Sequence, residues 1–314
     1  MLSLVRRATR AARARFRPAH VPGQAVLREA CRRVGHSAQG AELVGRSVNT
    51  VYRLAHDPVV VRIRPWSAAY VVEDQIRTAR LLVTAGAPLT RPLDVEQPVR
   101  VGAYVATFWV AAAAPGLEWQ TTHLGYALHA LHAVPAPERV PRWDPFSTVR
   151  RRIMAATYLD AASRAWCDQE TDRLERAYRD VAHALPTGIL HGDAHVANLL
   201  RGADGRPVLA DLDSIALGPQ LVDLTPTAVD SVRFCMRKRQ LAMVEAYGTD
   251  VTRHEAWPVL RRVRELSTTT FGLLTGVRDP RVAALARHRL RTLQDDDHEA
   301  RWHGYGAPRS VLDR

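Results

Sequence analysis

The spacing of apolar positions in the first third of the chain changes from helical to extended. Residues 25–35 place apolar side chains on one helical face and end at Gly35, which predicts an amphipathic helix. Residues 41–54 are apolar and β-branched on both sides of a Gly-, Ser- and Asn-bearing segment, a pattern typical of two strands joined by a hairpin. The β-branched run 59–65 ends at a proline and predicts a buried strand.

A second helix and further extended segments follow this strand. Ser67 is a suitable N-cap for a helix that continues to Gly86. Extended segments are expected around residues 90–93 and 99–109. The predicted order is therefore three strands, a helix and two more strands.

The rest of the chain is predicted to be mostly helical. Helical apolar patterns occupy residues 124–134, 145–165 and 172–184, and they return after Asp230. Residues 189–214 interrupt these patterns with short apolar runs around a glycine-bearing turn. This interruption predicts short strands beside a loop within the helical part.

Strands that precede helices predict an α+β fold with two lobes and a cleft where they join. We expect a small β-rich N-lobe in residues 25–108 and a larger, mainly helical C-lobe in residues 109–314. Residues 1–24 are expected to be a disordered basic tail. The oligomeric state does not follow from the sequence.

The charge of the chain is concentrated at its start. The formal net charge is +12, and the first 20 residues contribute half of it through six arginines and no acid. Such a segment is similar to a transit peptide, and it could also contact nucleic acid or anionic lipid. We favour a frayed basic extension without an obligatory nucleic-acid partner, because chain termini are commonly disordered.

The overall composition indicates a globular protein. Hydrophobic residues make up 46% of the chain and charged residues 24%. Apolar runs are too short for a transmembrane segment. The three cysteines are far apart and lack metal-ligand spacing, so we expect a reducing, cytoplasmic location.

The interrupted region carries the candidate chemistry. Asp193 and Asn198 stand in one loop, and a predicted hairpin returns Asp211 towards Asn198. Carboxylate and amide oxygens suit Mg²⁺, which binds one or two carboxylates together with substrate phosphates. Asn198 and Asp211 could therefore hold the metal, and Asp193 could orient a substrate hydroxyl and accept its proton.

The spacing H-x-D-x-x-x-x-N, followed by an Asp thirteen residues later, resembles that of protein-kinase-like enzymes. With Gly192 after the histidine, the segment resembles the aminoglycoside phosphotransferase and choline kinase-like family. The resemblance implies a bilobal protein-kinase-like fold. It also implies structural support of the loop by His191 and Asp223, whereas Pro219 and Gln220 replace the family's Asp-Pro. We assign no chemical role to Asp213 or His195.

The N-lobe offers candidate nucleotide-binding residues. Gly45, Ser47 and Asn49 lie between two strands and resemble the family's Gly-x-Ser-x-Asn segment, whose donors cover phosphates. The fold implies a basic residue on the third strand and a Glu partner in the next helix. Because Lys238 is the only lysine, the candidate is Arg62, with Arg64 as the alternative, and Glu73 is the expected partner. The apolar run after Ala106 resembles a hinge that adenine contacts.

The resemblance implies a kinase that transfers the γ-phosphate of ATP or GTP to a hydroxyl of a small acceptor, with Mg²⁺. The acceptor could be an antibiotic, amino alcohol, sugar or nucleoside. The acidic run 295–297 could line its site, but a solvated helix start is the preferred interpretation. Two alternatives are a catalytically weak nucleotide-binding protein and a nucleic-acid- or membrane-binding protein that uses the basic tail.

Overall fold

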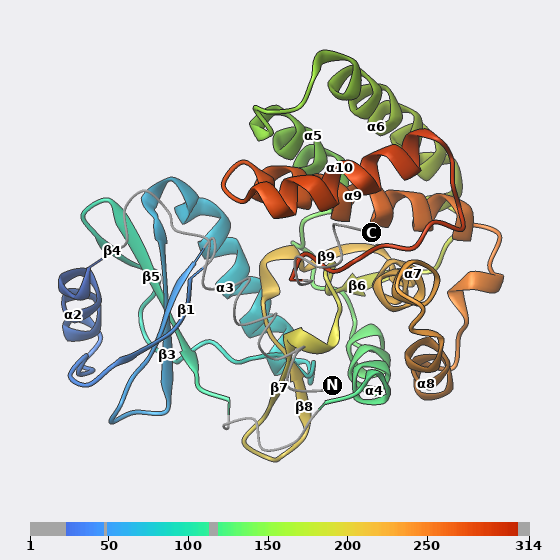
Figure 1. Ribbon diagram of the computed structural model, residues 1–314. Helices are drawn as coiled ribbons and strands as arrows, with labels where there is room; N and C mark the ends of the chain where they lie inside the picture. Colours follow the sequence, from blue (N-terminus) through green and yellow to red (C-terminus); the bar gives the residue numbers. More distant parts are fainter. Residues whose placement is uncertain (1–22, 47–48, 113–118, 307–314) are drawn as a thin grey trace. The chain divides into compact units, whose positions relative to one another are not determined.

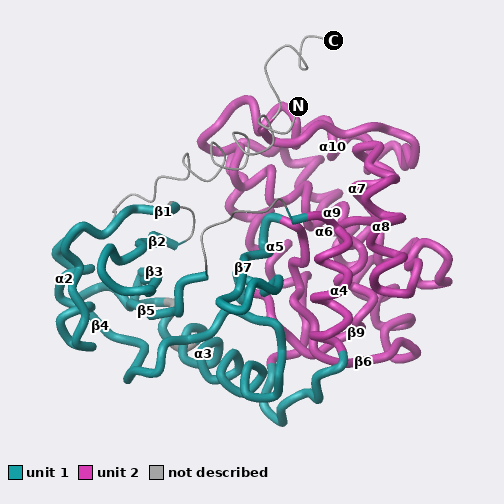
Figure 2. Tube along the Cα trace, turned by 90° about the horizontal axis from the view of Figure 1, so that it is seen from below, with its two compact units in different colours: residues 1–119, 133–140, 197–213 teal, residues 120–132, 141–196, 214–314 magenta. Residues whose placement is uncertain are grey.

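The computed structural model describes residues 23–46, 49–112 and 119–306. The chain divides into two compact units, which Figure 2 colours separately. Unit 1 comprises the described parts of Met1–Trp119, with Ala133–Val140 and Ala197–Asp213. Unit 2 comprises Gln120–His132, Pro141–Val196 and the described part of Ser214–Arg314. Unit 1 therefore includes two segments that follow residue 119 in the sequence. The lobe boundary expected between residues 108 and 109 stays a prediction.

Unit 1 is built on a five-stranded antiparallel sheet of order β1-β2-β3-β5-β4. Its strands are β1 (Glu42–Arg46), β2 (Thr50–Arg53), β3 (Val59–Pro65), β4 (Val99–Val101) and β5 (Tyr104–Val110). The three strands predicted before the helix are confirmed, whereas the extended segment predicted at 99–109 is a hairpin of two strands that turns at Gly102. Residues 90–93 form an isolated bridge from Pro92 to Trp109 rather than a strand.

Two helices accompany this sheet. Helix α2 (Gln24–Arg33) packs against β4 and β5, and Figure 1 shows it at the β4 side. The 3₁₀ turn η1 (Trp66–Ala68) leads directly into α3 (Ala69–Thr84), so Ser67 lies inside a helical turn instead of capping it. Residues 1–22 of the predicted tail lie outside the described residues.

A small hairpin belongs to unit 1 although it comes much later in the chain. Strands β7 (Leu199–Arg201) and β8 (Pro207–Leu209) pair in antiparallel register. The backbone of Leu209 donates to the carbonyl of Pro88 at 2.7 Å and accepts from Thr90 at 2.9 Å. The segment that follows α3 therefore fixes this hairpin beside the sheet.

Unit 2 is mainly helical, as predicted. Its helices are α4 (Thr121–His132), α5 (Pro145–Ala155), α6 (Ala161–Ala182), α7 (Thr225–Arg233), α8 (Arg237–Tyr247), α9 (Trp257–Gly276) and α10 (Pro280–Gln294). Strands β6 (Thr187–Leu190) and β9 (Ala216–Pro219) form an antiparallel pair. Short 3₁₀ turns are η2 (Val196–Asn198), η3 (Leu212–Ser214), η4 (Gln220–Leu224) and η5 (Val251–Arg253).

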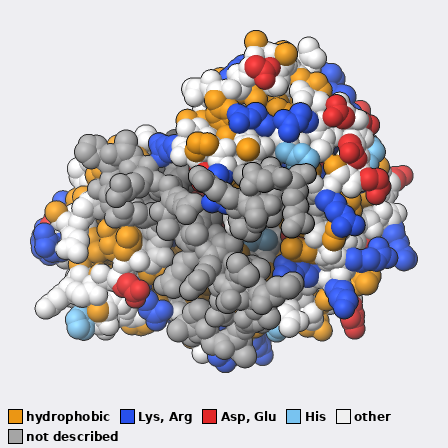
Figure 3. All heavy atoms as spheres, in the orientation of Figure 1, with side chains coloured by type: hydrophobic (Ala, Val, Ile, Leu, Met, Phe, Trp, Pro, Cys, Tyr) orange, Lys and Arg blue, Asp and Glu red, His pale blue; other side chains and the backbone are white. Residues whose placement is uncertain are grey.

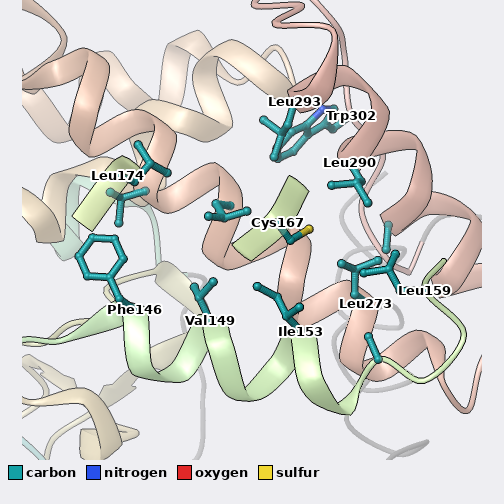
Figure 4. Packing of buried hydrophobic residues seen from close by; sticks show 14 residues of the cluster. Phe146, Val149, Ile153, Leu159, Cys167, Leu174, Leu273, Leu290, Leu293 and Trp302 are labelled. Atoms are coloured by element: carbon teal, nitrogen blue, oxygen red, sulfur yellow. The ribbon is translucent and has the colours of Figure 1, made fainter. Parts of the chain in front are cut away.

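The core of unit 2 lies between α5, α6, α9 and α10. Figure 4 shows the side chains that meet there: Phe146, Val149, Ile153, Cys167, Leu174, Leu273, Leu290, Leu293 and Trp302. Each is at most 4% exposed. Fully burying a side chain such as Leu or Phe contributes roughly 1.5–3 kcal/mol. This core therefore fixes these four helices of unit 2 against one another.

Two predictions for the helical part are wrong. The predicted helix 145–165 is broken, because Asp160 caps α6 by accepting from the Ser163 amide at 2.8 Å. The acidic run 295–297 follows the C-terminal end of α10 and does not begin a helix. Asp297 instead caps the following turn by accepting from the amides of Glu299 and Ala300.

The surface charge of the described residues is mixed. Figure 3 shows basic and acidic side chains on the same face at the right of the view. In unit 2, for example, Arg150 pairs with Asp172 at 2.7 Å and with Glu175 at 2.6 Å. Among the described residues, no helix has both the length and the apolar character required to cross a membrane.

Candidate active site

The β7–β8 hairpin positions Asn198 and Asp211 at the same end of its two strands. Leu199 pairs with Leu209, and the amide of Ala210 donates to the carbonyl of Asn198 at 2.8 Å. Asn198 is 3% exposed, whereas 47% of the Asp211 side chain is exposed. Asp211 has a φ of 64°, a left-handed conformation that aspartate adopts more readily than most other non-glycine residues.

A cavity of about 900 Å³, its open mouth included, lies within unit 1. Strands β1, β2, β3 and β5, the segment after α3 and the hairpin all contribute to its wall. The lining residues are Val44, Gly45, Asn49, Val51, Val60, Arg62, Thr90, Trp109, Val110, Ala112, Ala197, Asn198, Leu200, Ala210 and Asp211. Of the sequence-predicted residues of unit 1, Gly45, Asn49, Arg62, Asn198 and Asp211 therefore line one cavity. Glu73 does not line it, and Ser47 lies outside the described residues.

Arg62 is the basic group of this cavity. It projects from β3, and its guanidinium donates to Asp211 Oδ1 at 3.0 Å and to Asp213 Oδ1 at 3.1 Å. It also lies 5.9 Å from the ring centre of Trp109 on the paired strand. An arginine held beside carboxylates and an aromatic ring presents a preorganised fork for phosphate oxygens.

Arg64 is a second, more buried arginine that binds Asp213. It lies two residues along β3 and is 8% exposed, and it donates to Asn49 Oδ1 and to Asp213 Oδ2. Gln75 of α3 donates to Asp213 Oδ1 at 2.6 Å. Burial raises the pKa of Asp213, but the charges of Arg62 and Arg64 outweigh it and hold the pKa below its usual value. Asp213 therefore stays ionised and bridges the two arginines.

The predicted pairing of Arg62 with Glu73 is wrong. Glu73 is exposed on α3, whose buried face carries Val72 and Ile76. On α3 it is Gln75 that contacts Asp213, the carboxylate shared by Arg62 and Arg64. The carboxylates that pair with Arg62 belong to the segment that follows β8. The ion pair that we expected from a helix is thus supplied by the hairpin.

The predicted hinge contributes an apolar wall. Trp109, Val110 and Ala112 line the cavity, and Trp109 is 4% exposed. The Trp109 indole donates to Thr107 Oγ1 at 2.9 Å, which satisfies its polar atom within the sheet. Residues 113–118 of the hinge run lie outside the described residues.

In unit 2, a buried carboxylate holds the loop after β6. Asp223 is fully buried and accepts from the amide of His191 at 2.6 Å and from that of Gly192 at 2.8 Å. His132 of α4 lies 3.1 Å from Asp223 Oδ2 and 2.7 Å from the Tyr247 hydroxyl. Two backbone donors and an imidazole therefore share one carboxylate, which fixes the path of the chain just before Asp193.

Only glycine fits at position 192. Its φ is +78°, and a Cβ atom there would lie 2.3 Å from the Ser214 carbonyl oxygen. We therefore expect Gly192→Ala to lower the free energy of unfolding by roughly 2 kcal/mol or more, measured by urea denaturation. Gly205→Ala is the matched control, because Gly205 also has a positive φ but would meet only the Arg201 side chain at 3.6 Å. Equal losses in the two variants would contradict the proposed clash.

Asp193 follows this braced segment and is paired with basic side chains of unit 2. Arg264 of α9 donates to Asp193 Oδ1 at 3.0 Å, and His195 Nε2 lies 3.6 Å from Oδ2. The side chain remains 42% exposed. Burial raises the pKa of Asp193, but His195 and Arg264 outweigh it and hold the pKa well below its usual range. The carboxylate is therefore ionised and partly open.

Sequence reasoning did not find two of these contributors. Arg264 lies 71 residues after Asp193 on a helix whose apolar pattern gives no sign of a site. The sequence assigned no role to Asp213, although this residue, two positions after Asp211, pairs with both Arg62 and Arg64. Arg62 and Arg64 lie two residues apart and therefore share one face of β3. Two arginines on one strand face indicate that a second acid lies nearby to balance their charge.

The sequence model of the phosphotransferase enzyme family matches residues 41–266. No curated protein matches the chain.

Solved structures of small-molecule kinases resemble its fold. Amicoumacin kinase hAmiN, solved with AMP-PNP, Ca²⁺ and amicoumacin, superposes with a TM-score of 0.70 at 14% identity, over 90% of this chain and 96% of that one. Aminoglycoside phosphotransferase APH(3'')-Id from Streptomyces rimosus has a TM-score of 0.58 at 21% identity, over 79% and 99%. A choline/ethanolamine kinase family protein from Mesorhizobium loti has a TM-score of 0.58 at 19% identity, over 92% and 95%.

These likenesses confirm the predicted protein-kinase-like fold, with an antiparallel sheet in the N-terminal part and helices in the C-terminal part. Since the family model covers well over half of the sequence and includes both the sheet and the His191–Asn198 loop, the chain belongs to the phosphotransferase enzyme family.

Proposed function

We propose that this protein is a small-molecule kinase that transfers the γ-phosphate of ATP or GTP to a hydroxyl group of a small acceptor. The observation that carries the proposal is the cavity of unit 1. Its lining residues include Arg62, Asn198 and Asp211, whose side chains carry a guanidinium, an amide and a carboxylate. A cation and paired oxygen ligands beside an apolar wall are what a metal-bound nucleotide requires.

The nucleotide is assigned to this cavity. Trp109, Val110 and Ala112 offer an apolar surface for the base. At the other end, Gly45 lies at the β-bulge of the β1–β2 hairpin, where exposed amides suit phosphate. Arg62 supplies the charge for the phosphates, and Asn49 supports it by holding the neighbouring Arg64. We keep Ser47 in this group from the sequence alone.

Asn198 and Asp211 are the proposed ligands of Mg²⁺. Their oxygens line the same cavity, and Mg²⁺ commonly completes its shell with water and phosphate oxygens rather than with a cage of protein ligands. When bound, the ion neutralises charge on the phosphates. Asp211 also accepts from Arg62, whose second carboxylate partner, Asp213, keeps the guanidinium in place.

Asp193 is the proposed catalytic base. It orients the acceptor hydroxyl and takes its proton as the oxygen bonds to the γ-phosphorus and the bond to the β-phosphate oxygen breaks. His191 and Asp223 act only as support, because their bonds fix the loop backbone. We expect the reaction to take place in the cytoplasm.

The direct test is a screen of phosphotransfer by the full-length chain. ATP and GTP are each supplied with Mg²⁺ and a panel of hydroxyl-bearing acceptors, and nucleoside diphosphate release and the phosphorylated product are both measured. Product formation that requires Mg²⁺ supports the proposal. Tight nucleotide binding without product from any acceptor would instead favour the catalytically weak nucleotide-binding protein.

Asp211→Asn tests the metal assignment. Removing one charge from the ligand pair should weaken binding of the magnesium–nucleotide complex by about 10-fold or more, measured by titration calorimetry. Asp204→Asn is the matched control, since Asp204 is an exposed acid at the tip of the same hairpin. Unchanged affinity in the Asp211 variant would remove Asp211 from the metal site.

A further inference from the structure

The charged groups around Asp193 bear on the nature of the acceptor. Helix α9 carries Arg264, Ser267 and Phe271 at positions three or four residues apart, so these residues share one helical face. Arg152 of the adjacent α5 lies along this face. Its Nη1 donates to the carbonyl of Ser267 at 2.9 Å and contacts Ser267 Oγ at 3.3 Å.

Arg152 is a partly buried cation that forms no ion pair with a carboxylate of the described residues. Its hydrogen bonds among the described residues go to neutral oxygens of Ser267, and its guanidinium lies 5.4 Å from the Phe271 ring centre. The pKa of Arg152 is lowered to about 10, chiefly by burial; the charge of Asp193 opposes this shift and that of Arg264 adds to it. A buried guanidinium is ordinarily paired with an anion.

The acids of this neighbourhood are already engaged with other cations. Asp193 pairs with Arg264 and His195. Asp230 of α7 interacts with Arg264 and His195 too, and burial raises its pKa. The positive charge of Arg152 is thus left for an anionic ligand to neutralise.

The surface beside Arg152 can also accommodate a carbon skeleton. The Phe271 side chain is 44% exposed although it is large and apolar. It stands next to the guanidinium and two turns along α9 from Arg264. A ligand that places an anionic oxygen on Arg152 can rest its apolar part on this ring while its hydroxyl approaches Asp193.

We propose that the acceptor of this kinase carries an anionic group, a carboxylate or a phosphate, which Arg152 binds beside Asp193. This inference rests on the proposed function, because it assigns the acceptor to the neighbourhood of the proposed base. A cationic acceptor would instead meet the guanidinium of Arg152, whose hydrogen bonds within the described residues go to neutral oxygens.

The test compares acceptors that share one ring and differ only in charge: glucosamine, glucose, glucuronate and glucose 6-phosphate. Phosphotransfer to each is measured with the full-length chain, and the carboxylate and phosphate members distinguish the two anionic sources. The same anions are tested for binding through the thermal unfolding midpoint, with AMP-PNP and Mg²⁺ present so that the nucleotide cavity is filled.

Arg152→Gln should raise the KM for an anionic acceptor, or weaken its binding, about 10- to 100-fold and leave the neutral member unchanged, because a charge-assisted hydrogen bond is lost. Arg151→Gln is the matched control, since Arg151 is the exposed neighbour and donates to Thr148 Oγ1. This control should leave every acceptor unaffected.

The outcomes separate the two proposals. Preference for glucosamine, or equal effects of Arg152→Gln on charged and neutral members, overturns the anionic acceptor while the kinase assignment stands. Anion binding that depends on Arg152, without phosphotransfer to any member, supports the anion site and counts against the kinase. Anions that neither bind nor react overturn the inference.

Discussion

Replacing Asp193 by asparagine is expected to reduce phosphotransfer by about 10³-fold while nucleotide affinity stays within a factor of about two. The amide retains the size of the side chain and can still contact Arg264, but it cannot accept the proton of the acceptor hydroxyl. The residues proposed to bind nucleotide line a cavity built entirely within unit 1, so their geometry does not depend on this side chain. Turnover with a verified acceptor gives the first quantity, and titration with AMP-PNP and Mg²⁺ gives the second.

Asp180→Asn is the matched control for this variant. Asp180 is an exposed acid on α6 and should give unchanged turnover after the same change of carboxylate to amide. The midpoint of thermal unfolding must also be measured for Asp193→Asn, because the ion pair with Arg264 is lost. Turnover near that of the unmodified protein would remove Asp193 from the role of base.

The low pKa of Asp193 indicates how it would act. His195 and Arg264 stabilise the carboxylate against the effect of burial, so the group is ionised at neutral pH but is a weak base. In phosphoryl transfer, the attacking oxygen needs little activation before bonding to phosphorus begins. Asp193 is therefore suited to orienting the hydroxyl first and accepting its proton late.

Local patterns in the sequence predicted much of the fold. The run 59–65 became β3 with the same bounds, because a β-branched segment between turn residues has few other stable conformations. The break before α6 was missed because it depends on one capping bond between Asp160 and Ser163. An apolar pattern reports which face is buried and not where a short irregular segment separates two helices.

The candidate site likewise contains residues that the sequence could place and contacts that it could not. Asn198 and Asp211 could be placed from the sequence because a short hairpin fixes their separation. The pairing of Arg62 with Asp211 and of Asp193 with Arg264 could not be predicted, since the partners of each pair lie far apart in the chain. Glu73 illustrates the error: a helix can be predicted from its spacing, but which of its turns faces an arginine depends on how the helix packs.

The largest loss of stability is expected at a buried ion pair of unit 2. Glu265 of α9 is 1% exposed and Arg233 of α7 is fully buried, and their contact is 2.7 Å. Arg233 also donates to the carbonyls of Asp297 and Ala300 and lies 4.7 Å from the Trp302 ring centre. The pair thereby joins two helices to the segment after α10.

Glu265→Ala should lower the free energy of unfolding of this unit by about 3–5 kcal/mol, because it leaves the Arg233 charge buried without its carboxylate. Urea unfolding followed by tryptophan fluorescence measures this, since Trp302 stacks on Arg233. Glu255→Ala, which truncates an exposed acid, is the control and should change stability by less than about 0.5 kcal/mol.

The double variant Arg233→Met with Glu265→Leu separates the cost of an unpaired charge from the value of the pair. Apolar replacements of similar size remove both charges from the interior, so the double variant should recover much of the stability that Glu265→Ala loses. If it is instead as unstable as Glu265→Ala, the loss comes from bonds that the double variant also removes: those of Arg233 to the carbonyls of Asp297 and Ala300, and that of Arg261 to Glu265 Oε1 at 2.8 Å. In that case Arg233 also matters because it anchors the segment that carries Trp302.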